Sequence, residues 1–236
     1  MNKLGLNIAF VINVTRQRTF RPYRYTLLHK LFQDHEFNLL DVGCGNHSAR
    51  LAKYWFPKCH YFGLDKDKNY NNNAADFLLM DNFYETDLTM LDFQVIPDNK
   101  FDVIILSHVI EHLTNGDQVI QKILGKIRPG GYIYIEYPGI RSTKKRRFLW
   151  NFYKDPSHCR IYSIPQICSI LEHNDMNILH KGIRRDVLEI IASPFAAVLS
   201  LILIGYISGS TVSSIYGMNE YVFACKGALV PTSSAL

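Results

Sequence analysis

Two short stretches of the sequence combine glycines and carboxylates in a pattern that suits a nucleoside. One apolar run ends in the turn Asp-Val-Gly-Cys-Gly at residues 41–45, and the next apolar run ends at Asp65. Gly43 and Gly45 have no Cβ, so the backbone there can adopt unusual dihedrals and approach a ligand closely. A carboxylate at the end of the second strand can accept hydrogen bonds from both ribose hydroxyls. These residues therefore predict a pocket for an adenosine-containing cofactor.

A second group, His108, Glu111 and His112, has the His-x-x-Glu-His pattern of inverted zinc peptidases. In that chemistry two histidines bind the metal and the glutamate acts as general base. The pattern needs a helix on each side and a further carboxylate downstream, whereas residues 103–106 form an apolar run typical of a buried strand. A zinc peptidase remains an alternative, but the main prediction contains no metal site.

A third polar cluster, Asp-Pro-Ser-His-Cys-Arg-Ile-Tyr-Ser at residues 155–163, follows the expected fifth strand. His158 is the candidate general base, because the pKa of histidine suits removal of a proton from a hydroxyl or an amine near neutral pH. Arg160 is a candidate for binding an acidic group of the substrate. The alternative is that both side chains only order this loop through hydrogen bonds.

Apolar runs that alternate with helix-spaced segments predict the elements that position these residues. Strands are expected at 37–42, 60–65, 101–106, 132–137, 177–183 and 220–226, with a short strand or turn at 77–80. Helices are expected at 23–32, 48–56 and 117–127, and at 163–173, where Ser163 and Gln166 have the spacing of a capping box. This order predicts a doubly wound α/β domain with a Rossmann-like sheet, mostly parallel with a last antiparallel strand, and helices on both faces.

Composition and charge limit the class of protein. The 236 residues are enough for one large domain, and 47% are hydrophobic, as in globular proteins. The net charge of +5 is too small to indicate nucleic acid by itself, and no nucleic-acid partner is expected. The five cysteines include no Cys-x-x-Cys pair, and arginines follow the N-terminal apolar patch rather than precede it. Both observations favour a reduced protein without a secretory signal, in the cytoplasm.

One segment departs from the pattern of alternating elements. Residues 190–216 contain no charged side chain, and this length is within the range of a membrane-spanning helix. Pro194, Gly205 and Gly209 interrupt the segment, and expected strands of one sheet flank it. The interpretations are a buried or lid-like insertion at 187–216, shallow membrane contact through 190–216, and a membrane span. The expected organisation is one domain with a helical extension (1–36), a cofactor-binding core (37–137), an acceptor-side half (138–226) and a tail (227–236).

Taken together, the motifs resemble those of the class I S-adenosylmethionine-dependent methyltransferases. The acidic-x-Gly-x-Gly motif of these enzymes is matched by residues 41–45, and their acidic residue after the second strand is matched by Asp65. Their Asp-Leu pair is matched by Asp87 and Leu88, and the turn before their fifth strand by Arg-Pro-Gly-Gly at 128–131. The sequence departs from the family at His47, where many members have a third glycine. This side chain is expected to point away from the methionine end of the cofactor or to contact the carboxylate there.

The resemblance implies S-adenosyl-L-methionine as the cofactor. It implies that Asp41 accepts a hydrogen bond from the ammonium group, that Asp65 binds the ribose, and that Asp87 binds the adenine amino group, unless Asp87 is only a helix cap. The cofactor-binding residues that it implies are Asp41, Gly43, Cys44, Gly45, Asp65, Lys66, Asp87, Leu88, Ser107 and His108. The expected reaction is methyl transfer to an oxygen or nitrogen of a small or lipid-linked acceptor, such as a glycan precursor. A non-catalytic S-adenosylmethionine-binding protein remains the alternative.

Overall fold

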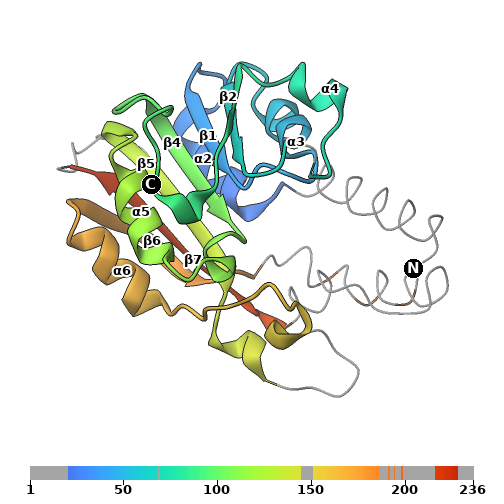
Figure 1. The fold of residues 1–236 in the computed structure, drawn as a ribbon, viewed down its shortest axis with the longest axis vertical. Helices are drawn as coiled ribbons and strands as arrows, with labels where there is room; N and C mark the ends of the chain where they lie inside the picture. Colours follow the sequence, from blue (N-terminus) through green and yellow to red (C-terminus); the bar gives the residue numbers. More distant parts are fainter. Residues whose placement is uncertain are drawn as a thin grey trace.

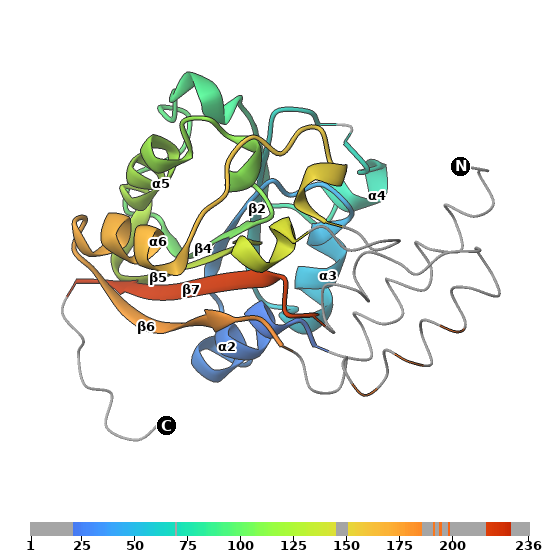
Figure 2. The ribbon, with the colours of Figure 1, turned by 90° about the horizontal axis from the view of Figure 1, so that it is seen from below.

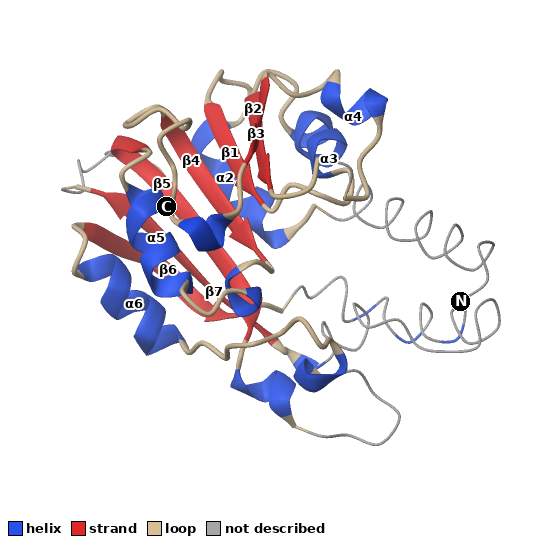
Figure 3. Ribbon diagram, viewed as in Figure 1, coloured by secondary structure: helices blue, strands red, loops and turns tan. Residues whose placement is uncertain are grey.

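The computed structural model describes residues 21–68, 70–144, 151–185 and 216–227 and the single residues 191, 194 and 198. Within these residues, seven strands form one sheet in the order β3-β2-β1-β4-β5-β7-β6 (Figure 1 and Figure 3). β7 is antiparallel to both of its neighbours, and the remaining pairs are parallel. The strands are β1 (Asn38–Val42), β2 (His60–Asp65), β3 (Asn82–Glu85), β4 (Phe101–Ser107), β5 (Ile127–Pro138), β6 (Met176–Ile183) and β7 (Asn219–Lys226).

Helices cover both faces of this sheet, as Figure 2 shows. One face packs against α5 (Gly116–Leu124) and α6 (Ile164–Glu172), and the other packs against α2 (Tyr23–Phe32) and α3 (Ser48–Trp55). Successive side chains of a strand point to opposite faces. In β4, Ile104 and Leu106 therefore join the first core, and Val103 and Ile105 join the second. A strand buried on both faces needs a continuous apolar run, which is the pattern that predicted the doubly wound α/β fold, now confirmed.

The carboxyl ends of three neighbouring strands meet at one edge of the sheet. Val42 of β1 is paired with Leu64 of β2 on one side and with Leu106 of β4 on the other. The residues that follow these three strands are therefore neighbours in space, although they are far apart in the sequence. The strand order also reverses between β1 and β4, and open parallel sheets bind their ligands at such a point. This edge is where the predicted cofactor site lies.

The third strand lies later in the sequence than expected. Of the two options for residues 77–80, strand or turn, the structure shows a turn that follows the short helix α4 (Ala74–Phe77). The helix forms because Asn73 caps it: the Asn73 side chain accepts from the amide of Ala75, and the Asp76 side chain accepts from the amide of Asn73. Asn73, the last of three consecutive asparagines, is therefore a helix N-cap, and β3 begins only after this helix.

Two other boundaries also differ from the prediction. α5 ends at Leu124 rather than at residue 127, because Ile127 is already paired with Phe101 in the sheet. The register shifts before the next pair, Val103 with Tyr132, so residues 128–131 are an irregular part of β5 rather than a simple helix stop. α6 begins after Ser163 as predicted, but the Ser163 side chain makes no capping hydrogen bond. The predicted capping box is therefore wrong.

Most of the apolar segment at 187–216 lies outside the described residues, as do residues 1–20, 145–150 and 228–236. Of the segment, the structure describes Ile191, Pro194, Val198 and Tyr216, and the side chains of Ile191 and Val198 are exposed. Among the residues described, there is no helix with the length and apolar character that crossing a bilayer requires. The three interpretations of this segment, a buried or lid-like insertion, shallow membrane contact and a membrane span, all remain predictions.

Candidate functional site

The turn after β1 is folded tightly against the end of β2. The amides of Gly43 and Cys44 both donate to the carbonyl of Leu64, over 2.7 and 3.2 Å. Gly43 has a φ of +73°, and a Cβ on it would lie 2.5 Å from Cγ2 of Val109. Glycine adopts this left-handed conformation without strain and leaves room for Val109. Because the Cys44 side chain is fully buried, only its backbone can face a ligand.

Gly45, the second glycine of the motif, lies under Tyr70 of the loop after β2. A Cβ on Gly45 would lie 2.6 Å from Cδ1 of Tyr70 and 3.0 Å from the carbonyl oxygen of the same residue. The two loops therefore approach each other as closely as a glycine allows. Tyr70 lies in a polar run without a recognisable motif, so this contact was not predictable from the sequence.

His47 adopts a left-handed backbone conformation, which favours glycine. Its φ and ψ are 58° and 31°, in the left-handed region. Nδ1 of His47 lies 2.6 Å from Oδ2 of Asp76, and Nε of Arg50 lies 2.6 Å from Oδ1 of the same carboxylate. Asp76 is completely buried. The imidazole is therefore held toward α4, which explains how a histidine is accommodated at this turn.

Asp41, the acidic residue of the motif, is 5% exposed and lies on the face of the sheet that α2 and α3 cover. The hydroxyl of Tyr61 donates to Oδ2 of Asp41 over 2.8 Å. Burial raises the pKa of Asp41 to about 6, although the charge of Arg24 and the hydrogen bond from Tyr61 oppose this shift. A nearby cation favours the charged form of a carboxylate. Asp41 is therefore ionised at neutral pH and suited to an ammonium group.

Asp65 ends β2 beside this turn. Its Oδ1 accepts hydrogen bonds from the backbone amides of Lys66 and Asp67, over 2.8 and 3.4 Å. These bonds orient the carboxylate beyond the end of the strand, where ribose hydroxyls are expected. Lys66 takes part through its backbone amide rather than through its charge.

Asp87, which follows β3, caps a short 3-10 turn, η1 (Leu88–Met90). Its Oδ1 accepts from the hydroxyl and the amide of Thr89, and these hydrogen bonds lower the pKa of Asp87. The helix-cap interpretation therefore accounts for one oxygen of this carboxylate. Leu88 is 8% exposed and belongs to the core under α5. The roles of both residues toward adenine remain predictions.

His108, after β4, lies between two buried glutamates. Its Nδ1 is 3.2 Å from Oε1 of Glu111, and its Nε2 is 3.4 Å from Oε1 of Glu136. Burial lowers the pKa of His108, but the hydrogen bonds and charges of the two glutamates outweigh it and raise the pKa to about 9. The imidazole is therefore cationic at neutral pH and unsuited to act as a base. Ser107 precedes it, paired in the sheet with Glu136.

Glu136 is a residue of this site that sequence analysis missed. It accepts hydrogen bonds from Arg184 over 2.9 Å, from Asn219 over 3.2 Å and from the hydroxyl of Tyr134 over 2.6 Å. Burial alone would raise the pKa of Glu136, but the charge of Arg184 and the hydrogen bonds from His108 and Tyr134 hold it well below its usual range. A charged residue within the apolar run 132–137 was the signal that could have identified it.

The loop with the two predicted catalytic residues is docked onto the turn η2 (Ile110–His112). The carbonyl of Glu111 accepts the amides of both Cys159 and Arg160, over 2.9 and 3.2 Å. The guanidinium of Arg160 forms a 2.6 Å ion pair with Asp117 of α5. Arg160 therefore makes contacts that order this loop, as the alternative interpretation expects. Its predicted role in binding an acidic group of the substrate remains a prediction.

His158 is held by the turn η4 (Phe152–Lys154). Its Nδ1 donates to the carbonyl of Phe152 over 2.9 Å, and its side chain is 4% exposed. The ring of His158 lies 4.7 Å from the ring of His112, between centroids. The structure thus brings together His112 and His158, which sequence analysis had assigned to separate patterns. Whether His158 acts as a base remains a prediction.

The peptidase pattern does not have the helical structure that it requires. Residues Ile110–His112 form a three-residue 3-10 turn, and His108 has a left-handed φ of 59°. Nε2 of His108 also lies 3.2 Å from Nδ2 of Asn219, on the side of β7. His108 and His112 therefore do not share one helix face, and the zinc-peptidase alternative lacks structural support.

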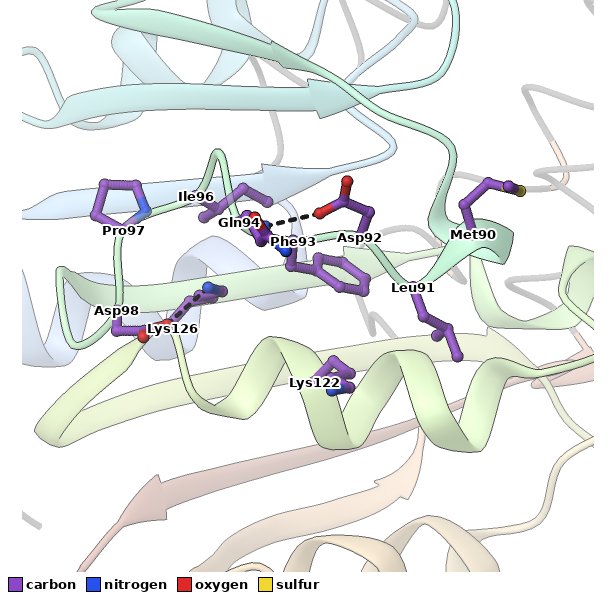
Figure 4. A pocket seen from close by; sticks show the side chains of 10 residues that line it. All are labelled: Met90, Leu91, Asp92, Phe93, Gln94, Ile96, Pro97, Asp98, Lys122 and Lys126. Carbon is purple, nitrogen blue, oxygen red and sulfur yellow. Dashed lines mark hydrogen bonds and ion pairs between the residues drawn. The ribbon is translucent and has the colours of Figure 1, made fainter.

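A hollow of about 630 Å³ lies between α5 and the segment that follows Leu88 (Figure 4). It is lined by residues of the 90–98 loop and by Lys122 and Lys126, and Lys126 forms a 2.6 Å ion pair with Asp98 at one end. None of the lining residues is a predicted cofactor-binding residue. The hollow therefore adds no residue to the predicted cofactor site.

Comparison with known proteins identifies the family. A family model described as a methyltransferase domain matches residues 15–181, which is more than half of the chain. The chain belongs to this family. Among solved structures, a S-adenosylmethionine-dependent methyltransferase from Archaeoglobus fulgidus has a TM-score of 0.56 and 20% identity, over 92% of this chain and 94% of that chain. The predicted family and fold class are therefore confirmed, and S-adenosylmethionine is the cofactor of this class.

Three curated relatives match part of the chain. The protein MJ0906 of Methanocaldococcus jannaschii is 36% identical over 104 residues, 41% of this chain and 27% of that protein. The trans-aconitate 2-methyltransferase of Rhodopseudomonas palustris is 28% identical over 120 residues, 50% of this chain and 44% of that enzyme. The mitochondrial ubiquinone biosynthesis O-methyltransferase of Dictyostelium discoideum is 28% identical over 123 residues, 48% of this chain and 36% of that enzyme. The match thus spans less than half of the length of each relative.

Proposed function

We propose that this chain transfers the methyl group of S-adenosyl-L-methionine to an oxygen or a nitrogen of a small or lipid-linked acceptor. The observation that carries this proposal is the gathering of the motif residues at one edge of the sheet. The turn at 43–45 follows β1, Asp65 ends β2 and His108 follows β4, and these strands are neighbours in the sheet. The loop with His158 and Arg160 is docked directly on the segment after His108. Cofactor and acceptor can therefore meet at this edge.

The residues of the edge divide the work of holding the cofactor, whose sulfonium supplies an electrophilic methyl group when bound. Gly43 and Gly45 admit the methionine part close to the backbone, and Asp41 accepts a hydrogen bond from its ammonium group. Asp65 accepts from the ribose hydroxyls, and Asp87 uses the oxygen that does not cap η1 for the adenine amino group. Alignment of the acceptor with the methyl group then provides most of the catalysis.

The acceptor side is formed by the loop around His158 and Arg160. Because Arg160 is paired with Asp117, we assign it the role of holding this loop in place. An acidic acceptor would contact the guanidinium while this ion pair is kept. Nδ1 of His158 donates to the carbonyl of Phe152, so in the tautomer that this bond requires the lone pair is on Nε2, which lies 3.8 Å from Oδ2 of Asp155. This nitrogen can accept a proton from an acceptor hydroxyl or coordinate a cation.

The acceptor class is supported by two different features. One relative is named as a trans-aconitate methyltransferase and another as an O-methyltransferase of ubiquinone biosynthesis, so a small acid and a lipid-linked ring are both represented among the matches. The uncharged residues 190–216 of this sequence suit an apolar acceptor or a membrane surface. Both acceptor types therefore belong to the proposal.

Calorimetric titration with S-adenosylhomocysteine tests the cofactor part. We expect one site per chain and at least tenfold weaker binding for Asp65→Ala, because a carboxylate that binds two hydroxyls contributes charge-assisted hydrogen bonds. Asp92→Asn, an exposed carboxylate after η1, is the matched control and should bind as the wild type does. No binding by ligand-free protein, or equal binding by Asp65→Ala, would contradict the proposal.

The acceptor can be sought with S-adenosylmethionine that carries a labelled methyl group. The protein is incubated with an aqueous metabolite extract or with a lipid extract in detergent, and the labelled product is partitioned between water and organic solvent. Label in the organic phase would identify a lipid-linked acceptor, and label in the aqueous phase a small one. Cofactor binding without any labelled product would favour the non-catalytic alternative.

A further inference from the structure

We propose that Glu111, His112 and His158 bind a divalent transition-metal ion of the zinc type beside the cofactor site. One ligand atom of each of the three residues lies within 4.8 Å of the other two. Two of the residues come from the turn after β4, and the third comes from a loop that follows β5. The cluster therefore exists only in the folded chain.

Glu111 provides the observation that points to a ligand. Its side chain is 1% exposed, and its Oε1 is 3.2 Å from Nδ1 of His108. Its Oε2 is buried and has no hydrogen-bond partner among the residues that the structure describes. Burial of a carboxylate oxygen without a partner is unfavourable, whereas a coordinated cation would satisfy it.

In both histidines Nδ1 donates a hydrogen bond, so Nε2 is the nitrogen that has the lone pair for a metal ion. Nδ1 of His158 can only donate to the carbonyl of Phe152, which leaves its Nε2 with the lone pair. The hydroxyl of Ser157 donates to Asp155, so the 2.9 Å contact between Ser157 and Nδ1 of His112 is a donation from the imidazole. Metal-binding histidines generally donate their second N–H to a carbonyl or to a carboxylate-linked group in this manner.

The loop that carries His158 is fixed to the turn that carries the other two ligands. The backbone carbonyl of Glu111 accepts two amides of this loop, those of Cys159 and Arg160. The ion pair of Arg160 with Asp117 adds a side-chain contact to α5. These bonds hold the two imidazole rings at a centroid distance of 4.7 Å. The positions of the ligands are therefore set by the fold and do not depend on an ion.

The donor set indicates which metal ions fit. Two imidazole nitrogens and one carboxylate suit Zn²⁺, Co²⁺, Mn²⁺ or Fe²⁺, whereas Mg²⁺ and Ca²⁺ prefer oxygen ligands alone. With bonds of about 2.0–2.1 Å, the ligand atoms of a tetrahedral zinc ion lie roughly 3.4 Å apart. The ligand atoms of the cluster lie within 4.8 Å of one another, so at most small side-chain rotations are needed to reach this spacing. Three protein ligands leave a fourth position open, as in catalytic zinc sites.

The open position gives the ion a role that rests on the proposed function. Glu111 contacts His108 at the end of β4, so the ion would lie on the acceptor side of the methyl group. A bound hydroxyl or carboxylate oxygen of the acceptor would be oriented there, and a metal ion lowers the pKa of a bound hydroxyl. The acceptor oxygen would then form its bond to the methyl carbon as the bond from that carbon to the sulfonium sulfur breaks and S-adenosylhomocysteine leaves, while the proton of the acceptor passes to solvent or to a nearby base.

Metal binding can be measured without cofactor or acceptor, so its failure is distinct from failure of the proposed function. The full chain is treated with a chelator, desalted and titrated with Zn²⁺ in a calorimeter, and with Co²⁺ while the visible spectrum is recorded. We expect one ion per chain, Co²⁺ bands of a low-coordinate nitrogen and oxygen site, and no competition by millimolar Mg²⁺.

Single substitutions connect the binding to the three residues. His112→Gln, His158→Gln and Glu111→Gln should each weaken Zn²⁺ binding at least tenfold, and His60→Gln should leave it unchanged. His60 is a suitable control because it also lies beside a carboxylate, at 2.9 Å from Asp81, but has no second histidine. Circular dichroism shows which variants fold. If one variant does not fold, the other two still test whether these residues bind the ion. Absence of stoichiometric Zn²⁺ uptake by the wild type, or uptake unaffected by the folded variants, would overturn the proposal.

Discussion

Nδ1 of His47 lies 2.6 Å from Oδ2 of Asp76, so a buried carboxylate from α4 holds the turn at which many family members have a glycine. The same carboxylate binds Arg50 and the amide of Asn73. One side chain thus ties the end of β1, the first turn of α3 and the start of α4 together. A strained left-handed histidine is tolerated because these contacts offset its backbone energy.

Substitution of Asp76 should therefore lower both the unfolding free energy of the protein and its affinity for the cofactor. Asp76→Ala removes the shared partner of His47 and Arg50 and one of the two capping-box hydrogen bonds of α4, and breaking a buried ion pair in this way costs about 3 kcal/mol of unfolding free energy. Urea unfolding measures this loss, and titration with S-adenosylhomocysteine should show weaker binding. An Asp76→Ala variant as stable as the wild type would contradict the account of this turn.

His47→Gly is the matched test at the same turn. Glycine adopts the left-handed conformation without strain but loses the contact with Asp76, and the two effects are each of the order of 1 kcal/mol. We therefore expect the unfolding free energy to change by less than about 1 kcal/mol. Cofactor affinity should stay within threefold of the wild type. A large loss of affinity would mean that the imidazole contacts the cofactor directly.

The buried carboxyl of Asp41 should make the cofactor-free protein less stable as pH rises. Its pKa is about 6 in the fold and 3.8 as the ordinary value, so the folded state prefers the protonated form. The stability from this group is fully present below pH 4, is lost between pH 4 and 6, and amounts to about 3 kcal/mol. Asp41→Asn should remove this part of the pH dependence. The difference in unfolding free energy between variant and wild type, measured from pH 4 to 7, should therefore change by about this amount. An identical pH dependence in the variant would contradict this assignment.

The same carboxyl should make cofactor binding depend on pH with the opposite sign. An ammonium group favours the ionised form, so S-adenosylhomocysteine should bind more tightly as the pH rises through 6. Between pH 5 and 7 the ionised fraction increases about tenfold, which sets the expected gain in affinity. Calorimetry in buffers of different ionisation enthalpy would detect the proton released on binding. Asp41→Asn should bind weakly at every pH.

The order of the elements was predictable because it depends on local sequence. The buried strands appear as apolar runs, and glycine or carboxylate residues mark their carboxyl ends, so Gly43, Asp65 and His108 could be placed at one edge. The exception, β3, was missed because it is short and follows an asparagine-capped helix that resembles a loop in composition. Where a single hydrogen-bonding pattern such as the cap at Asn73 decides the structure, hydrophobic periodicity alone has little to detect.

The partners of the site residues were not predictable, because they come from distant parts of the chain. Asn219 and Arg184 reach the end of β4 only through the pairing of β7 and β6 with β5. His158 reaches His112 through a loop that binds the carbonyl of Glu111. No spacing in the sequence encodes such contacts. The pattern that was most noticeable, His-x-x-Glu-His, grouped His112 with His108, whereas the ring beside His112 in the structure is that of His158.

Alanine substitutions at Gly43 and Gly45, in the turn after β1, should be more harmful than one at a glycine whose surroundings have room for a Cβ. Gly43→Ala forces a positive φ on alanine and a contact with Val109, so it should destabilise the protein by at least about 1 kcal/mol and weaken cofactor binding. Gly45→Ala would displace the loop at Tyr70 and should mainly weaken binding. Gly182→Ala is the control, since its Cβ would lie 3.7 Å from Tyr221 in ordinary contact. Equal behaviour of Gly43→Ala and Gly182→Ala would show that the close approach at Val109 is unimportant.

The ion pair between Glu136 and Arg184 should support the site only above acidic pH. The pKa of Glu136 is held well below its usual value of 4.5, so the folded state prefers the ionised form. Stability from this group is therefore present above about pH 4.5 and is lost as the pH falls below it. At pH 7, Glu136→Gln should cost about 3 kcal/mol, because Arg184 and His108 lose the carboxylate between them.

Three comparisons make this prediction specific. The difference in unfolding free energy between wild type and Glu136→Gln should shrink below pH 4.5, which a simple packing defect would not produce. Glu85→Gln, an exposed carboxylate at the end of β3, should change stability by less than about 0.5 kcal/mol. The double variant Glu136→Gln/Arg184→Met should be less destabilised than the sum of the two single variants, because it leaves no buried charge without a partner. Strict additivity would show that the two residues do not act as a pair.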